Sequence, residues 1–208
     1  MRGELLGLMP IADGSHSVLP KGSPNAEGPR VARPCRTCHE PTSVVCVGCG
    51  AVQVPPVTID PFVVFGLSPA WHLDLVDLEA RYRALARLIH PDRQGGKSAT
   101  DRMYALQWTA GVNEARRLLR DEVKRAWYLA TGSPVPKEKG VTLSPEFLAE
   151  MFEWREEEEE CPGSRAERSA VRATEIRAEL DAMFSSWEAG SGDLSRVEEA
   201  LSRLRYVS

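Results

Sequence analysis

The 208-residue sequence predicts a mostly α-helical fold with three folded parts: a small cysteine module, a four-helix domain and a C-terminal antiparallel three-helix bundle. Three observations favour this class. Apolar residues recur every three or four positions from residue 60 onward, which is the period of an amphipathic helix. Alternating apolar and polar residues, the pattern of a half-buried strand, do not occur outside the cysteine module. Short connections between the last three helical segments favour antiparallel packing.

Composition changes divide the chain into segments. Residues 1–33 are rich in glycine, proline and serine and predict a disordered tail. The cysteine module occupies residues 34–53, the four-helix domain 58–132 and the three-helix bundle 143–208. Prolines and a glycine between 132 and 143 predict a linker between the two helical domains.

Charge is distributed unevenly along the chain, whose net charge is −4. Residues 1–59 carry a net charge of +1, residues 60–131 carry +2 and residues 132–208 carry −7. Such asymmetry favours separate surfaces for separate partners. The most basic segment is only slightly positive, so we expect no nucleic-acid partner.

The cellular location of the protein is predicted from its apolar runs, its N-terminal residues and its arginine content. Hydrophobic residues make up 42% of it without an apolar run long enough to cross a bilayer, so we expect no membrane association. The N-terminal residues lack the charged lead-in and apolar stretch of a secretory signal. Arginine outnumbers lysine 21 to 5, which we interpret as coding bias. We therefore expect a bacterial cytoplasmic protein rather than a mitochondrial one.

Capping residues predict where the helices of the four-helix domain begin. Asp60, followed by proline, can cap a short first helix that Gly66 ends. Asp74 can cap the second helix, and Ser98 the third, with Asp101 placed to support that cap. A short fourth helix is expected over residues 122–130.

The inward face of the third helix is predicted from its apolar spacing. We expect Met103, Leu106 and Ala110, and then Val112 or Asn113 through to Leu118, to face the core. Gly111 weakens a helix interior, so its presence there predicts close packing of another segment against it. In the bundle, Asp193 is expected to cap the last helix.

Four cysteines form the clearest chemical motif in the N-terminal part. Cys35 and Cys38 make one pair, Cys46 and Cys49 a second, and seven residues separate the pairs. Two such pairs suit tetrahedral coordination by four thiolates, with Zn²⁺ as the expected metal and iron as the alternative. Too few residues surround the pairs to build an apolar core, so the metal would supply folding energy.

A His90-Pro91-Asp92 tripeptide follows the amphipathic stretch 78–89. Proline fixes the backbone after the helix and leaves the flanking histidine and aspartate on a turn. Taken alone, the tripeptide could simply end a helix. Its context favours a function, because Arg83 and Arg87, together with Arg81, lie off the apolar face of the helix.

This arrangement resembles the signature of J-domain co-chaperones. The resemblance implies that His90, Pro91 and Asp92 stimulate ATP hydrolysis by a DnaK-class chaperone, and that Arg83 and Arg87 face an acidic patch on it. Complementary charge of this kind speeds encounter and sets orientation. The protein would itself be no enzyme.

Further motifs lie at residues 62–67, 74–75, 112–115, 124–129 and 147–156. Together they resemble HscB, the J-domain protein of iron–sulfur cluster assembly. The resemblance extends over about residues 60–208 and implies an HscA-like chaperone and an IscU-type scaffold as partners. Some eukaryotic members also carry two cysteine pairs before the J-domain.

The same resemblance implies a scaffold-binding patch on the bundle, formed by Leu148, Ala149 and Phe152 of its first helix and Tyr206 of its last. Ala149 is smaller than the residue often found there. The alternative is that these residues form the bundle core. Two other functions remain open: a J-domain protein with a different client, and an electron carrier with iron at the cysteines.

Overall fold

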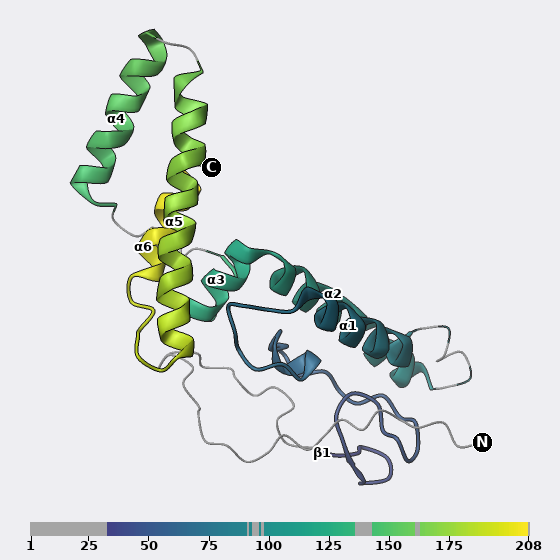
Figure 1. The fold of residues 1–208 in the computed structure, drawn as a ribbon. Helices are drawn as coiled ribbons and strands as arrows, with labels where there is room; N and C mark the ends of the chain where they lie inside the picture. Colours follow the sequence, from purple (N-terminus) through teal and green to yellow (C-terminus); the bar gives the residue numbers. More distant parts are fainter. Residues whose placement is uncertain are drawn as a thin grey trace.

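The computed structural model describes residues 33–90, 92, 96, 98–135, 143–160 and 163–207; for residues 160 and 164 it describes the backbone only. The expected tail before residue 33, Pro91 and most of the expected linker lie outside these residues. Within them the mostly α-helical fold is confirmed (Figure 1). Its elements are β1 (Arg33–Pro34), β2 (Pro41–Thr42), the 3-10 turn η1 (Val63–Phe65), α1 (Leu75–Ile89), α2 (Ala99–Arg120), α3 (Glu122–Thr131), α4 (Pro145–Glu160), α5 (Ser164–Glu188) and α6 (Val197–Val207).

The cysteine module is a small knuckle with little regular structure. Strands β1 and β2 pair antiparallel, and a single bridge joins Val45 to Val52. Its own buried cluster consists of only Cys35, Cys46 and Ala51. So small an apolar core cannot hold the knuckle folded, which leaves that task to a metal or to the neighbouring domain.

Helix starts in the next domain follow the predicted caps. Asp74 accepts hydrogen bonds from the N–H groups of the first turn of α1, and Ser98 accepts one from Asp101 N at the start of α2. Asp60 accepts from the N–H groups that open η1, and Gly66 ends that turn at φ 66°. The first helix of the domain is therefore a single 3-10 turn, while α1, α2 and α3 are longer.

The predicted inward face of α2 is wrong in part. Met103, Leu106 and Ala110 are exposed, whereas Val112 and Leu118 are buried as expected. Ala105, Trp108, Ala115 and Leu119 complete the buried face of this helix. The helix is covered on two sides, because α1 packs along it and the segment after the knuckle packs near Trp108, whose Nε1 donates to Gln53 O at 2.9 Å.

Gly111 allows the close approach that its position predicted. A Cβ atom at this residue would lie 2.2 Å from Ile59 Cδ1. Ile59 belongs to the segment between the knuckle and η1. The glycine therefore lets this segment lie directly against α2.

Three helices form the C-terminal bundle. In Figure 1, α4 and α5 run antiparallel as a long hairpin, and α6 packs against α5. Its core includes Phe147, Ile176, Leu180, Phe184 and Leu201. Asp193 does not cap α6 directly, since that helix begins four residues later; its carboxylate instead accepts from Ser195 N in the preceding turn.

The two helical domains meet through α3, α6 and the segment before α1. Trp71 is buried there, and Arg125 of α3 lies over its ring at 5.2 Å. Arg125 Nε also donates to Trp71 O at 3.1 Å. This buried arginine, whose pKa is lowered by burial, links α3 to the segment that enters α1.

Candidate metal centre and partner-binding surfaces

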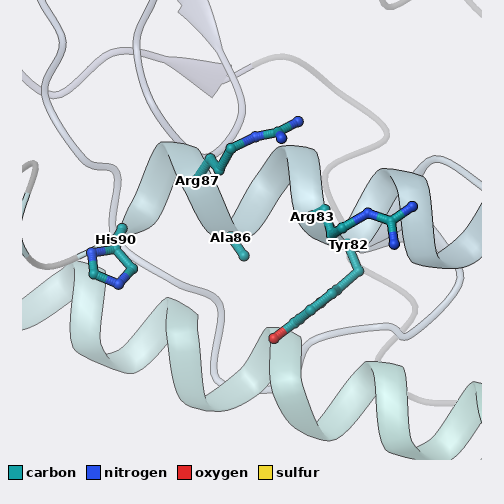
Figure 2. Close-up of a pocket in the computed structure, with 5 residues that line it drawn as sticks. All are labelled: Tyr82, Arg83, Ala86, Arg87 and His90. Carbon is teal, nitrogen blue, oxygen red and sulfur yellow. The ribbon is translucent and has the colours of Figure 1, made fainter.

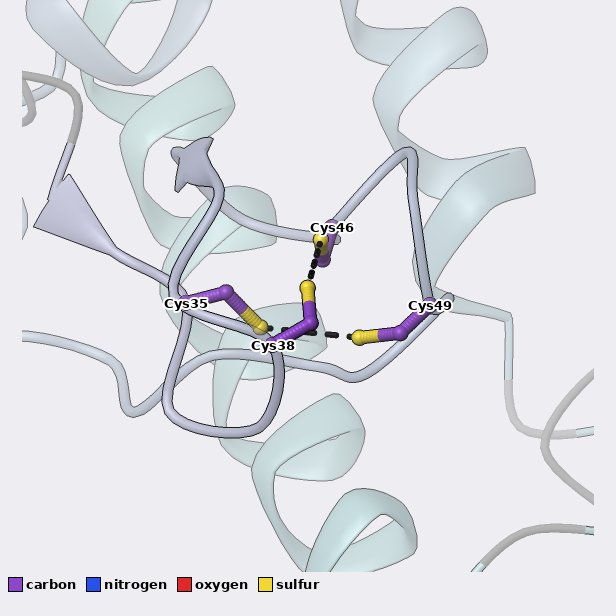
Figure 3. Close-up of side chains that lie close together, drawn as sticks. All are labelled: Cys35, Cys38, Cys46 and Cys49. Atoms are coloured by element: carbon purple, nitrogen blue, oxygen red, sulfur yellow. Dashed lines mark hydrogen bonds between the residues drawn. The ribbon is translucent and has the colours of Figure 1, made fainter.

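The four predicted cysteine ligands lie together (Figure 3). Their Sγ atoms are all within 4.8 Å of one another, with 3.5 Å between Cys35 and Cys49 and between Cys38 and Cys46. A tetrahedron of Zn–S bonds of about 2.3 Å has sulfur–sulfur edges of about 3.8 Å. The donor set and its spacing therefore fit one tetrahedral metal ion.

Electrostatics within the cluster favour a cation. The backbone N–H of Cys38 lowers the pKa of the Cys35 thiol to about 6, in spite of its burial. The N–H of Glu40 favours a Cys38 thiolate, but contacts with Cys46 and Cys49 outweigh it and raise the pKa of Cys38 to about 12. Without a cation, contacts with the other cysteines thus suppress ionisation of Cys38. A divalent metal would allow all four to ionise.

His90 and Asp92 are exposed at the end of α1. His90 is the residue that follows the last turn of the helix, and Asp92 N donates to its Nδ1 at 3.3 Å. The Asp92 carboxylate lies 3.6 Å from the same nitrogen. The buried Ile89 anchors the helix end in the core, so the histidine and the aspartate stand beyond it in solvent.

A shallow groove runs along α1 beside His90 (Figure 2). Tyr82 and Ala86 line it, and Tyr82 reaches across to α2, where its hydroxyl donates to Asn113 at 2.9 Å. The predicted Arg83 and Arg87 also line it and are exposed. His90 and these two arginines therefore share one face of a single helix.

Arg81 serves a different purpose from its neighbours. Its Nε donates to Asp77 at 2.8 Å, and its guanidinium also donates to the carbonyl groups of Phe65 and Gly66. It therefore ties η1 to α1. The basic surface beside His90 is formed by the other two arginines.

The four predicted scaffold-binding residues are exposed rather than part of the core. Leu148 is 44% exposed, Phe152 65% and Tyr206 50%, and Ala149 is also exposed. Phe147, which is buried, contacts the Tyr206 ring edge-on at 5.9 Å. This contact places Tyr206, near the end of α6, beside the start of α4.

Sequence reasoning missed two sets of long-range contacts. In the first, His72 lies between Asp181 and Glu188 of α5, at 2.9 and 3.0 Å. In the second, Arg36 of the knuckle pairs with the buried Asp101 of α2. Neither set has a local signal, because their partners are far apart in sequence.

The chain is similar to known co-chaperones along most of its length. The family model described as the HSCB C-terminal oligomerisation domain matches residues 143–208. The co-chaperone HscB homolog of Bordetella pertussis is 41% identical over 123 residues, which cover 58% of this chain and 72% of the relative. The homolog of Burkholderia mallei is 34% identical over 151 residues, which cover 70% of this chain and 86% of the relative.

Solved structures agree with these relatives. Human co-chaperone HscB has a TM-score of 0.67 at 25% identity, covering 83% of this chain and 92% of its own. Chaperone HscB from Vibrio cholerae has a TM-score of 0.55 at 26% identity, covering 72% and 91%. Residues 58–208 are 151 of 208 positions, or about 73%, so the match with the human structure extends into the residues before 58.

The fold and these matches define the class of protein as a helical co-chaperone. Within it, the chain belongs to the HscB family. In the described part of the chain, no helix combines the length and apolar character needed to cross a membrane.

Proposed function

We propose that this protein binds an IscU-type iron–sulfur scaffold, delivers it to a DnaK-class, HscA-like chaperone and stimulates the ATPase of that chaperone. The observation that carries the proposal is the shared exposure of His90, Arg83 and Arg87 on one face of α1 in a member of the HscB family. The protein performs no hydrolysis itself. Its bacterial relatives favour a cytoplasmic setting in a bacterium over a mitochondrial one.

Charge supports the chaperone-binding half of the proposal. Arg83 and Arg87 present guanidinium groups to solvent, where they can meet an acidic surface and steer its approach. His90 and Asp92 lie at the end of the same surface, with Pro91 between them in the chain. The arginines would dock the chaperone, and the tripeptide would trigger its ATPase.

Exposed apolar side chains support the scaffold-binding half. Monomeric proteins seldom expose grouped large apolar residues without a partner. Leu148, Ala149 and Phe152 are exposed on α4, and the exposed Tyr206 of α6 contacts Phe147 beside them; we call these four exposed residues the apolar patch. We assign the scaffold to this patch, which lies on a different domain from the basic surface.

We propose zinc as the metal of the cysteine knuckle. When bound, it would neutralise the thiolates of Cys35, Cys38, Cys46 and Cys49 and hold the two halves of the knuckle together. Two of these cysteines are buried and two are exposed, and a closed four-thiolate set suits a structural ion. A colourless, redox-inactive preparation with one bound zinc supports this assignment; a coloured, redox-active iron protein would favour the electron-carrier alternative.

The function is tested by the ATPase rate of an HscA-like chaperone with this protein, an IscU-type scaffold, or both. Synergy between the two is the expected result, because the protein would present the scaffold and trigger hydrolysis at once. Stimulation without synergy would indicate a J-domain protein with another client. Absence of stimulation would contradict the proposal.

A further inference from the structure

Glu79 of α1 lies one helical turn before Arg83, but its carboxylate is bound by arginines of α2. Its Oε1 accepts a hydrogen bond from Arg116 Nε at 2.9 Å and lies 3.2 Å from Arg120 Nη1. The hydrogen bond from Arg116 lowers the pKa of Glu79, and the positive charges around the carboxylate lower that pKa further. Glu79 is therefore ionised and held toward α2.

Another pair on the same helix shows the contact that Glu79 would otherwise make with Arg83. An acidic residue four positions before an arginine forms a favourable pair on the surface of a helix. Asp77 and Arg81 have this spacing, and Arg81 Nε donates to Asp77 at 2.8 Å. Glu79 and Arg83 have it too, but among the residues that the structure describes no ion pair involves Arg83. The exposed guanidinium of Arg83 therefore stays available to a partner.

Arg116 is fixed in the orientation that its contact with Glu79 requires. Its guanidinium lies over the Tyr82 ring, 4.6 Å from the ring centroid. Tyr82 reaches toward α2, as Figure 2 shows, and its hydroxyl donates to Asn113 Oδ1 at 2.9 Å. The ring is thus anchored to the helix that carries Arg116. Stacking on a ring holds an arginine without using its N–H groups, which leaves Arg116 Nε for Glu79.

Arg117, the next residue of α2, provides a comparison. It is exposed, and its Nη1 donates to Glu114 of the same helix at 3.1 Å. Arg116 instead reaches α1, where it contacts both Tyr82 and Glu79. The two neighbours carry the same charge, and each pairs with one glutamate. A difference between their alanine variants therefore reports the contacts with α1 rather than the loss of a positive charge.

We propose that Arg116 is a positioning residue for the basic surface of α1: it draws Glu79 toward α2 and thereby leaves Arg83 available to an acidic partner. The role rests on the proposed function, in which Arg83 faces the chaperone. Without Arg116, the carboxylate of Glu79 would turn to Arg83 and neutralise its charge. Arg120 would hold the carboxylate less firmly, because its side chain is 51% exposed and lies farther from Oε1. Docking would weaken, while His90 would remain as it is.

NMR of the arginine Nε–H groups tests the change of partner in the full-length protein without a chaperone. The Nε–H of Arg83, assigned by its loss in Arg83→Lys, should exchange with solvent about two- to threefold more slowly in Arg116→Ala than in the wild type, because a pair with Glu79 protects it. Adding Glu79→Gln should restore the wild-type rate, since the amide carries no charge. Arg117→Ala should leave the exchange rate of Arg83 unchanged.

The ATPase assay with an HscA-like chaperone separates docking from triggering. In Arg116→Ala, we expect the concentration for half-maximal stimulation to rise about three- to fivefold, because the docking surface loses the charge of Arg83. The maximal rate should stay at the wild-type value, since His90 is untouched. Adding Glu79→Gln should restore the wild-type concentration. Adding Glu114→Gln instead gives the same net charge and should restore nothing, so the two double variants separate positioning from a general effect of charge or stability.

Arg116→Gln covers the case in which Arg116→Ala fails to fold. Glutamine can still pack over the Tyr82 ring but has no charge to hold Glu79, so it should give the same rise, reversed by Glu79→Gln. A wild-type half-maximal concentration in a folded Arg116 variant, or a rise that Glu79→Gln does not reverse, would overturn the proposal while leaving the proposed function intact. Failure of the wild-type protein to stimulate any HscA-like chaperone would instead overturn the proposed function and, with it, the docking role of Arg116.

Discussion

Trp71 stacks on Phe184, with ring centroids 4.5 Å apart and 12° between the ring planes. Trp71 precedes α1 and Phe184 lies in the core of the C-terminal bundle, so this contact is one of those that join the two helical domains. Trp71 Nε1 also donates to Asp181 at 3.1 Å, and its backbone N–H donates to Glu188. In the proposed function, this contact would keep the domain assigned to the client and the domain assigned to the ATPase together.

Replacing Trp71 by alanine should destabilise the protein by about 3–5 kcal/mol, the usual cost of removing a large buried aromatic side chain. Unfolding of the two domains should also separate into two transitions, because the shared contact is lost. Chemical denaturation followed by circular dichroism measures both effects. Trp71→Phe keeps an aromatic ring for stacking, so its free energy of unfolding should fall much less. A loss of less than about 1 kcal/mol in the free energy of unfolding of Trp71→Ala would argue against a stabilising role of this contact.

His72 should make the stability of the contact between the two helical domains depend on pH. The carboxylate of Glu188, and after it that of Asp181, raises the pKa of His72. Stability from protonated His72 is therefore fully present below pH about 6.5 and is lost as pH rises through the raised pKa of the folded state. The contribution should be small, because the side chains of His72 and Asp181 are both 57% exposed.

At acidic pH the two carboxylates have the opposite effect from His72: their contribution to stability is lost as pH falls. A hydrogen bond from Trp71, and then one from His72, lowers the pKa of Asp181, and hydrogen bonds from the same two residues outweigh burial to lower that of Glu188. Their contribution is present above pH about 4.5 and disappears as pH falls through the lowered pKa values. The free energy of unfolding of wild type minus that of His72→Gln should peak between these limits, near pH 5.5. A difference that is flat from pH 4 to 9 would contradict this account.

The double substitution Phe152→Ala and Tyr206→Ala should weaken scaffold binding by about 30-fold or more, because exposed aromatic residues at the centre of an interface contribute about 2 kcal/mol or more. Basal stimulation of the chaperone should be spared, since the patch lies outside the domain that carries His90. Titration calorimetry with an IscU-type scaffold measures the change. Val171→Ala removes another exposed apolar side chain of the bundle, from α5, and serves as the matched control. Equal affinities of the double variant and the wild type would exclude this surface.

Removing the metal should unfold the knuckle but leave the helices in place. The knuckle buries only Cys35, Cys46 and Ala51 in its own cluster, so it has little apolar surface to keep it folded. Far-ultraviolet circular dichroism should change little on chelation, while tryptophan fluorescence should shift because Trp108 loses its bond to Gln53. An unchanged emission spectrum after complete metal removal would show that the knuckle is held by the adjoining domain alone.

Features with local causes could be predicted from the sequence. Asp74 and Ser98 cap their helices because a short polar side chain can reach the free N–H groups of the first turn. The two cysteines of each pair lie close together because each pair occupies one tight turn. Gly111 predicted a close neighbour because a glycine within a helix is costly unless space requires it.

Features that depend on distant partners could not be predicted in this way. The exposure of Met103 and Leu106 follows from which sides of α2 the knuckle segment and α1 occupy, and apolar spacing alone does not determine those sides. The pairing of Arg36 with Asp101 spans 65 positions, and the stacking of Trp71 on Phe184 spans more than a hundred. Such contacts follow from the assembled fold.

The most direct test of the central claim is the ATPase rate of an HscA-like chaperone with wild-type protein and with His90→Gln. His90 is exposed beyond the last turn of α1, so the substitution should leave the melting temperature unchanged. The account predicts stimulation by the wild type and none above the basal rate by the folded variant, with or without the scaffold. Equal stimulation by both proteins would contradict it.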